Sequence, residues 1–265
     1  MELKEYEWVR FRKAPLRLVI GQVRFTIMPR FGQDAFIAGF QEAIRTDYPK
    51  VSREAAMTLQ ISPVGVQSGA GEKLWRFSSR DLLWSVVVSE SAITLEARKY
   101  STMKNFLTRF HSVLEAGKEQ LEITDRLRLG LRYINEIRYK EAESLSDWRK
   151  LLNEDFVSFD ASELLGGQVD HTIQEIQVNR SNGILAIRHG LLSGSVVAPL
   201  VSERPETGQF YLIDLDCYDV GEYELDIPPT LQQMQEYNDV MYRFFRWTLK
   251  DKLYDYLGPE HAQRS

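Results

Sequence analysis

Residues Asp125–Lys140 read DRLRLGLRYINEIRYK, in which apolar and polar side chains alternate along almost the whole stretch. Strict alternation is typical of a β-strand that is buried on one side and solvated on the other. The two predicted sides consist of Leu127, Leu129, Leu131, Tyr133, Ile137 and Tyr139, and of Arg126, Arg128, Arg132, Glu136 and Arg138. This strand divides the chain into two parts that show a similar order of elements.

The first part, before the strand, is predicted to begin with a strand from Leu16 to Met28 and a helix that ends at Pro49. Short strands are expected around Ala56–Ile61, Lys73–Ser78, Leu82–Val88 and Ala92–Ala97. A second helix should begin after Ser101 or Thr102, since either residue can act as an N-cap. The order is strand, helix, strands, helix.

The second part repeats this order. A short helix capped by Ser144 or Ser146 should lead to a hairpin around Asn179–Gly183. A long helix should run from Pro228–Pro229 to Leu257, with Gly258–Pro259 as its C-cap. The sequence therefore predicts an α+β protein with two halves, residues 1–124 and 125–265. Each half would pack an antiparallel sheet on long helices, as a saddle or a helix-grip-like duplication. Because no Pro/Gly/Ser-rich spacer separates the halves, they are expected to be tightly joined, and a single domain stays open.

The composition fits an ordinary folded protein of 265 residues, of which 43% are hydrophobic and 27% charged. The net charge is −5, but the first hundred residues carry an excess of Lys and Arg, and the remainder carries an excess of Asp and Glu. Cys217 is the only cysteine, which excludes an intramolecular disulfide and a thiolate metal cluster. Neither a signal peptide nor a run of membrane-spanning length is found, so a cytoplasmic location is expected, without membrane association.

Signals for catalysis are weak. Asp214, Asp216 and Asp219 in DLDCYD resemble the start of a calcium loop, but Tyr218 occupies the next ligand position, so acids on a solvent-facing strand are favoured. The four histidines lack the spacing of paired metal ligands, and phosphate-binding loops and nucleophile elbows are missing. We therefore predict no catalytic residue, no metal site and no cofactor. Enzyme activity of an unknown class is left as an alternative with no sequence support.

Binding is the favoured class of function, and the predicted contacts are Arg24, Arg126, Arg128, Arg132 and Asn135. The first hypothesis is a non-catalytic binding or regulatory protein that engages a protein partner or a ligand on a concave sheet surface. Because Arg132 and Asn135 must point to opposite sides of a regular strand, Asn135 is expected to be buried and bonded to a neighbouring backbone. A homodimer is left open, since dimers are the commonest oligomers.

The alternative is a nucleic-acid-binding protein. If the strand at Leu16–Met28 pairs with the central strand, their arginines could line one sheet face and neutralise several phosphates. The same arginines could instead pair with Glu96, with Glu136 or with acids of the second part.

Several motifs together resemble a known group of proteins. The pieces are Ala14–Pro15–Leu16 before a strand, Phe40 followed by Asp47–Tyr48–Pro49, the strand motif R-L-G-L-R-Y-I-N-x-I at Arg128–Ile137, and a closing helix from Tyr242 to Gly258. They resemble an uncharacterised family of sporadically distributed bacterial proteins of roughly this length, over nearly the whole chain. That resemblance implies an accessory role, as in a toxin–antitoxin or phage-defence locus. It supplies no catalytic residues.

Overall fold

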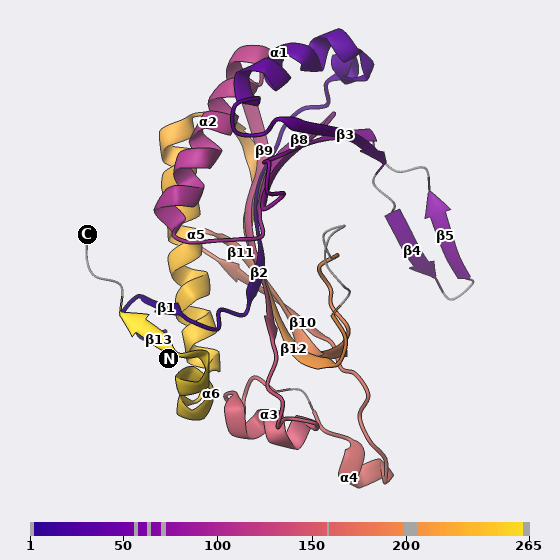
Figure 1. Ribbon diagram of the computed structural model, residues 1–265, viewed down its shortest axis with the longest axis vertical. Coiled ribbons are helices and arrows are strands. Elements are labelled where there is room, and N and C mark those ends of the chain that lie inside the picture. The colour runs from indigo at the N-terminus through magenta and orange to yellow at the C-terminus, as the bar shows by residue number, and fades with distance from the viewer. Residues whose placement is uncertain are drawn as a thin grey trace. The chain divides into compact units, whose positions relative to one another are not determined.

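The computed structural model describes residues 3–55, 58–62, 65–69, 73–157, 159–198 and 206–261, and it has a mixed α+β architecture, as predicted (Figure 1). The strands are β1 (Val9–Phe11), β2 (Leu16–Arg24), β3 (Lys50–Ala55), β4 (Thr58–Ser62), β5 (Gly65–Gly69), β6 (Lys73–Ser78), β7 (Trp84–Ser89), β8 (Ala92–Ala97), β9 (Asp125–Ile137), β10 (Gln174–Arg180), β11 (Gly183–Ser193), β12 (Gln209–Glu224) and β13 (Pro259–His261). The helices are α1 (Asp34–Ile44), α2 (Met103–Leu121), α3 (Leu145–Leu151), α4 (Ser162–Leu165), α5 (Ile227–Thr248) and α6 (Asp251–Leu257), with a 3₁₀ turn η1 (Pro29–Gly32).

Nine of the strands form one antiparallel sheet in the order β10-β11-β12-β9-β2-β8-β7-β6-β3. Two smaller sheets pair β1 with β13 and β4 with β5. By its contacts, the chain divides into two compact units. Unit 1 comprises residues 1–18, 132–217 and 236–265, and unit 2 comprises residues 19–131 and 218–235. The domain boundary at residues 124 and 125 stays a prediction, because compact units are defined by contacts and not by independent folding.

In unit 2, helices α1 and α2 pack together against one face of the strands. Helix α2 begins at its predicted cap, where the Thr102 hydroxyl accepts a hydrogen bond from the Asn105 N–H at 3.2 Å. Its apolar stripe is fully buried, with Phe106 and Phe110 next to each other at 6.2 Å between ring centroids. The residues of β8 that point toward α2, Ile93 and Leu95, are also fully buried. This face is therefore the core of unit 2.

Gly21 in β2 is packed against side chains of α2 and α5 in this core. A Cβ atom added there would lie 2.8 Å from Met234 Cε and 2.9 Å from the Phe106 ring. We expect Gly21→Val to lower the free energy of unfolding by roughly 1–3 kcal/mol, because the Phe106 ring is fully buried and packed against Phe110. Urea denaturation would measure this. Gly167→Ala is the control, since no atom lies within 4 Å of the added carbon, and an equal loss in both variants would contradict the packing argument.

In unit 1, the core is built from large aromatic side chains. Trp148 of α3 and Tyr211 of β12 are both fully buried, with their rings 5.3 Å apart. Phe156 stacks on His189 of β11 at 4.0 Å, and His189 Nδ1 lies 3.0 Å from the Tyr211 hydroxyl. The predicted hairpin is confirmed, since Asn179 pairs with Ile184 across a turn at residues 181 and 182.

The final helix differs from the prediction. Instead of one helix to Leu257, the structure has α5 and α6, separated at Leu249 and Lys250. The reason is a tertiary interaction: Leu249 forms a β-bridge with Leu152, and the Lys250 N–H donates to the Leu151 carbonyl at 3.0 Å. These backbone bonds replace the helical ones. Gly258 ends α6 in a left-handed conformation, as its predicted role as C-cap requires.

The shorter elements were predicted less accurately. The strand predicted from Leu16 to Met28 is β2, which ends at Arg24 because its partner β8 begins opposite it, at Ala92. The expected strand from Ala56 is seen as β4 from Thr58, and Ala56 itself lies outside the described residues. Strands β1, β3, β5 and β13 were not predicted.

Candidate functional site

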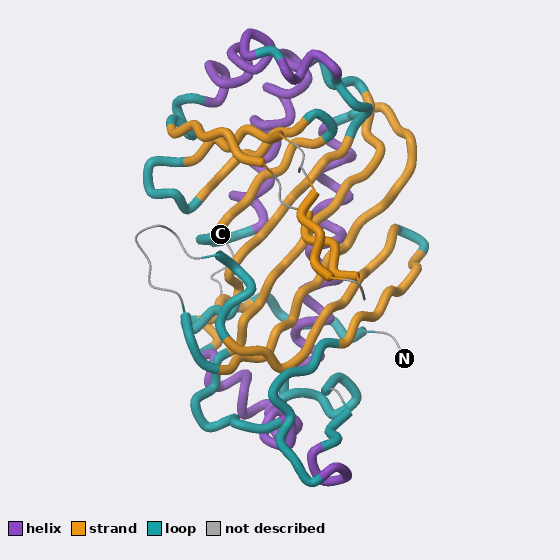
Figure 2. Tube along the Cα trace, turned by 90° about the vertical axis from the view of Figure 1, so that its right-hand side faces the viewer, coloured by secondary structure: helices purple, strands orange, loops and turns teal. Residues whose placement is uncertain are grey.

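One face of the unit 2 strands is not covered by the unit's helices, which lie behind the strands in Figure 2. Directly opposed residues of antiparallel strands point to the same side, so the register identifies this face. One row across it consists of Gln22, Thr94, Val87, Arg76 and Ser52, from five neighbouring strands. We call these residues, together with Arg24, Glu54, Ser78, Ser85 and Glu96, the open face. Its side chains are predominantly polar.

Arg76 lies at the centre of the open face and contacts acids on both sides. Its Nη1 lies 2.5 Å from Glu96, and its Nε lies 2.9 Å from Glu54. Burial alone would lower the pKa of the Arg76 guanidinium, but the two carboxylates outweigh that effect and raise it. Arg76 is therefore a fixed positive charge between two negative ones.

Hydrogen bonds between neighbouring strands order the rest of the open face. The Gln22 amide donates to the Thr94 hydroxyl at 3.0 Å, and the Ser78 and Ser85 hydroxyls are 2.9 Å apart. Arg128 of β9 donates to the Gln22 carbonyl at 3.3 Å. The polar groups are thus held in position before any ligand binds.

The other predicted contacts are held within the chain. Arg126, which the alternation had assigned to the solvated side, is buried, and its Nη1 donates to both carboxylate oxygens of Asp219, at 2.8 and 3.0 Å. Arg132 makes a bidentate pair with Asp214 at 2.7 and 2.5 Å, and these hydrogen bonds raise the pKa of its guanidinium. Asn135 is 5% exposed and donates to the Ile213 carbonyl at 3.0 Å, which confirms the expected backbone bond.

Two further expectations about β9 and β12 need correction. Asp214 is not a solvent-facing acid, because its side chain is only 6% exposed beneath Arg132. Glu136 was assigned to the solvated side of β9, yet its side chain is fully buried. Arg24 of β2, by contrast, is exposed at the edge of the open face, and no ion pair or hydrogen bond of its side chain is seen within the described part of the chain.

Glu136 is the centre of a polar cluster in unit 1. Its Oε1 accepts hydrogen bonds from the Ser195 hydroxyl at 2.7 Å and from the Val196 N–H at 2.9 Å. Its Oε2 accepts from Arg138 at 3.1 Å and lies 3.8 Å from Arg17. The cluster attaches residues 194–197 to the sheet, so the Ser195 hydroxyl is engaged in a structural contact.

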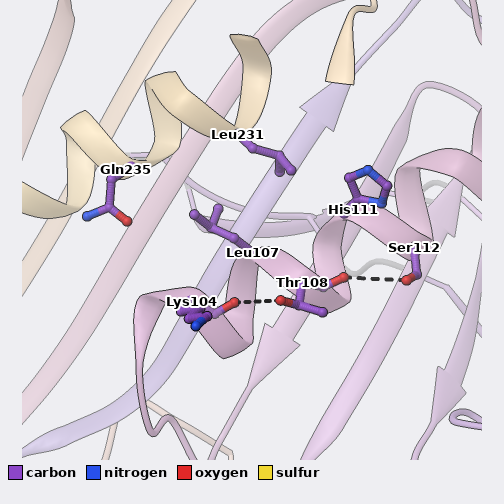
Figure 3. A pocket seen from close by; sticks show the side chains of 7 residues that line it. All are labelled: Lys104, Leu107, Thr108, His111, Ser112, Leu231 and Gln235. Carbon is purple, nitrogen blue, oxygen red and sulfur yellow. Dashed lines mark hydrogen bonds between the residues drawn. The ribbon is translucent and has the colours of Figure 1, made fainter. Parts of the chain in front are cut away.

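A groove of about 420 Å³ lies between α2 and the beginning of α5 in unit 2 (Figure 3). It is lined by Lys104, Leu107, Thr108, His111, Ser112, Leu231 and Gln235. The Thr108 and Ser112 hydroxyls donate to carbonyls one helical turn earlier, and His111 is 3.2 Å from Glu115. The hydroxyls are thus bonded to the helix backbone and are not aligned with a base, so the groove gives no support for a nucleophile.

Metal ligation finds no support within the described ranges, where no group of three or more His, Cys, Asp or Glu side chains is placed to hold an ion. His189 is paired with Gln174 in the sheet, and its ring nitrogen contacts the Tyr211 hydroxyl. Cys217 is fully buried. Among the described helices, none combines the length and the hydropathy that crossing a membrane requires.

The main residues of the open face, Arg76, Glu54 and Glu96, were not predicted as a group. They come from three strands, and only the strand register brings them together. The alternation in Lys73–Ser78 and Ala92–Ala97 was a usable signal, because it assigns Arg76 and Glu96 to the side opposite the apolar residues.

Comparisons of the chain with protein-family models, with curated proteins and with solved structures give no match.

Proposed function

We propose that this is a non-catalytic binding protein, and that the open face of unit 2 receives a protein partner. The observation that carries the proposal is the arrangement of Arg76 between Glu54 and Glu96, on a predominantly polar face that no helix of the unit covers. Preorganised polar groups favour specific recognition because little ordering is needed on binding.

Charge complementarity defines the kind of partner. Arg24 lies at the β2 end of the open face and Glu54 at the β3 end, and both are exposed. A partner that presents an acidic side chain near Arg24 and a basic one near Glu54 would match both. The family resemblance implies an accessory role in a toxin–antitoxin or phage-defence locus. Under this proposal, the partner would be encoded in the same locus.

Nucleic-acid binding through an arginine-lined face has less support. Arg126 and Arg132 are each ion-paired with an aspartate, so neither guanidinium is available to a phosphate without loss of that pair. The predicted duplication also remains part of the proposal. It is supported by the element order, in which β2, α1, strands and α2 are followed by β9, α3, strands and α5.

The test is a pulldown from native lysate with the full-length chain, with and without nuclease. We expect a stoichiometric protein that survives nuclease treatment, and we expect Arg24→Glu to weaken its binding by about tenfold or more, since like charges would oppose each other across the interface. Mass determination identifies the partner, and titration with the purified partner gives the affinity.

Arg80→Glu is the matched control. Arg80 is exposed in a turn of the same unit, so this substitution makes the same change of charge outside the open face. Equal weakening by both variants would indicate a general charge effect and contradict the proposed surface. Recovery of nuclease-sensitive nucleic acid alone would favour the alternative function.

A further inference from the structure

Strand β10 lies at one end of the nine-stranded sheet, and only β11 pairs with it among the described strands. All seven of its residues are exposed. Edge strands of soluble proteins are usually protected by proline, lysine, a bulge or a covering loop. The sequence of β10, QEIQVNR, contains neither proline nor lysine, and its register with β11 is continuous over its whole length. This edge is therefore able to accept another strand.

The hydrogen-bonding direction of β10 follows from its pairing. The Thr172 N–H, just before the strand, donates to the Leu191 carbonyl at 2.8 Å, in the same register as β10 and β11. Hydrogen-bonded and non-hydrogen-bonded residue pairs alternate along an antiparallel ladder. Because Thr172 forms a hydrogen-bonded pair, the even-numbered residues of β10 direct their backbone N–H and C=O groups toward β11. Glu175, Gln177 and Asn179 thus direct their N–H and C=O groups toward the free edge.

The side chains of β10 place apolar residues beside the unit 1 core. Ile176 lies opposite Ile187 and Val178 lies opposite Leu185, and both β11 residues are buried. Ile176 and Val178 are nevertheless 45% and 42% exposed. The apolar face of the hairpin therefore continues to the free edge, where nothing in the described chain covers it.

A second copy of the strand matches this edge. In an antiparallel pair centred on Gln177, Gln177 lies opposite its own copy, Glu175 lies opposite Asn179, and Ile176 lies opposite Val178. Every outward N–H and C=O group of the three odd-numbered residues then gains a partner. The apolar side chains meet on one face, and no like charges are opposed. A register centred on Glu175 or on Arg180 would instead oppose two like charges.

We propose that the protein forms a twofold-symmetric homodimer through β10, in the antiparallel register centred on Gln177. This inference does not depend on the proposed function, since it concerns unit 1 and not the open face. Strand pairing alone buries less than the roughly 800 Å² per partner of a standard interface, so we expect a dissociation constant in the micromolar range.

The test uses single cysteines introduced into the full-length chain, because Cys217 is buried and gives little background. In the proposed register, the Cα atoms of residue 177 in the two copies lie about 5.5 Å apart, within disulfide range. The Cα atoms of residue 179 lie roughly 14 Å apart, beyond that range. We expect Gln177→Cys to give about tenfold more disulfide-linked dimer than Asn179→Cys under mild oxidation, a difference that this geometry predicts.

Light scattering on the reduced chain, well above micromolar concentration, should give the mass of a dimer. Gln177→Pro should give a monomer, since it removes an outward N–H without removing a bond to β11, and circular dichroism would verify its fold. A monomeric wild type would overturn the proposal, as would equal cross-linking of both cysteine variants or a dimer that Gln177→Pro leaves intact. A heteromeric complex that forms only with another protein's strand would overturn the assignment of a second copy.

Discussion

Replacement of Glu136 by alanine should lower the free energy of unfolding by about 3–5 kcal/mol, because it leaves the Val196 and Val197 N–H groups and the Ser195 hydroxyl without their buried acceptor. The carboxylate is fully buried, and it accepts hydrogen bonds from Ser195, Val196 and Arg138. Removing one partner of a buried charged cluster costs the desolvation of the groups left behind. Urea denaturation monitored by circular dichroism measures the loss.

The matched control is Glu206→Gln, in the same cluster. Glu206 lies 2.5 Å from Arg17 and 2.7 Å from Arg138, but its side chain is about one-third exposed. Its loss should cost less than about 1 kcal/mol, as exposed ion pairs do. Glu136→Gln should be intermediate, since the amide retains one acceptor oxygen. If Glu136→Ala were as stable as Glu206→Gln, the cluster would not be the structural support inferred for residues 194–197.

Acidification should destabilise the protein through His189. Burial lowers the pKa of His189 from 6.5 to about 4, so the folded protein holds this imidazole neutral. The unfolded chain binds a proton near pH 6.5, and the folded chain does so only near pH 4. Stability attributable to His189 is therefore complete above pH 6.5, and about 3 kcal/mol of it is lost as the pH falls to 4.

Unfolding free energies at several pH values between 4 and 7.5 measure this effect, and His189→Gln separates it from the titration of carboxylates. Glutamine can still bond the Tyr211 hydroxyl but cannot take up a proton. We expect the difference in stability between wild type and variant to shrink steadily below pH 6.5. A difference that does not vary with pH would show that His189 is protonated equally in both states.

The sequence predicted correctly the helix ends and the turn that depend on residues close together in the chain. Thr102 begins α2, Gly258 ends α6, and the turn after Asn179 forms a hairpin, because each signal acts within a few residues. The alternation also predicted correctly that Leu129, Leu131 and Tyr133 of β9 are buried. What local patterns could not supply was the identity of partners far along the chain.

Glu136 shows why. By alternation it belongs with the solvated arginines, but residues 194–197 cover it and supply its donors. Arg126 is buried for the same kind of reason, since Asp219 lies more than ninety residues away in sequence. The break between α5 and α6 likewise depends on Leu152. The open face was missed because its residues come from separate strands.

The pairing of β1 with β13 bears on how the chain folds as it leaves the ribosome. Val9 lies opposite His261, and the Val9 N–H donates to the Tyr242 hydroxyl, 233 residues away. Translation is vectorial, so this N-terminal strand emerges long before its partners exist. Unit 1 can close only after residues 236–261 have been synthesised, whereas residues 19–131 can collapse earlier. The N-terminal segment must therefore stay unpaired through most of synthesis, a period in which chaperones have access to it.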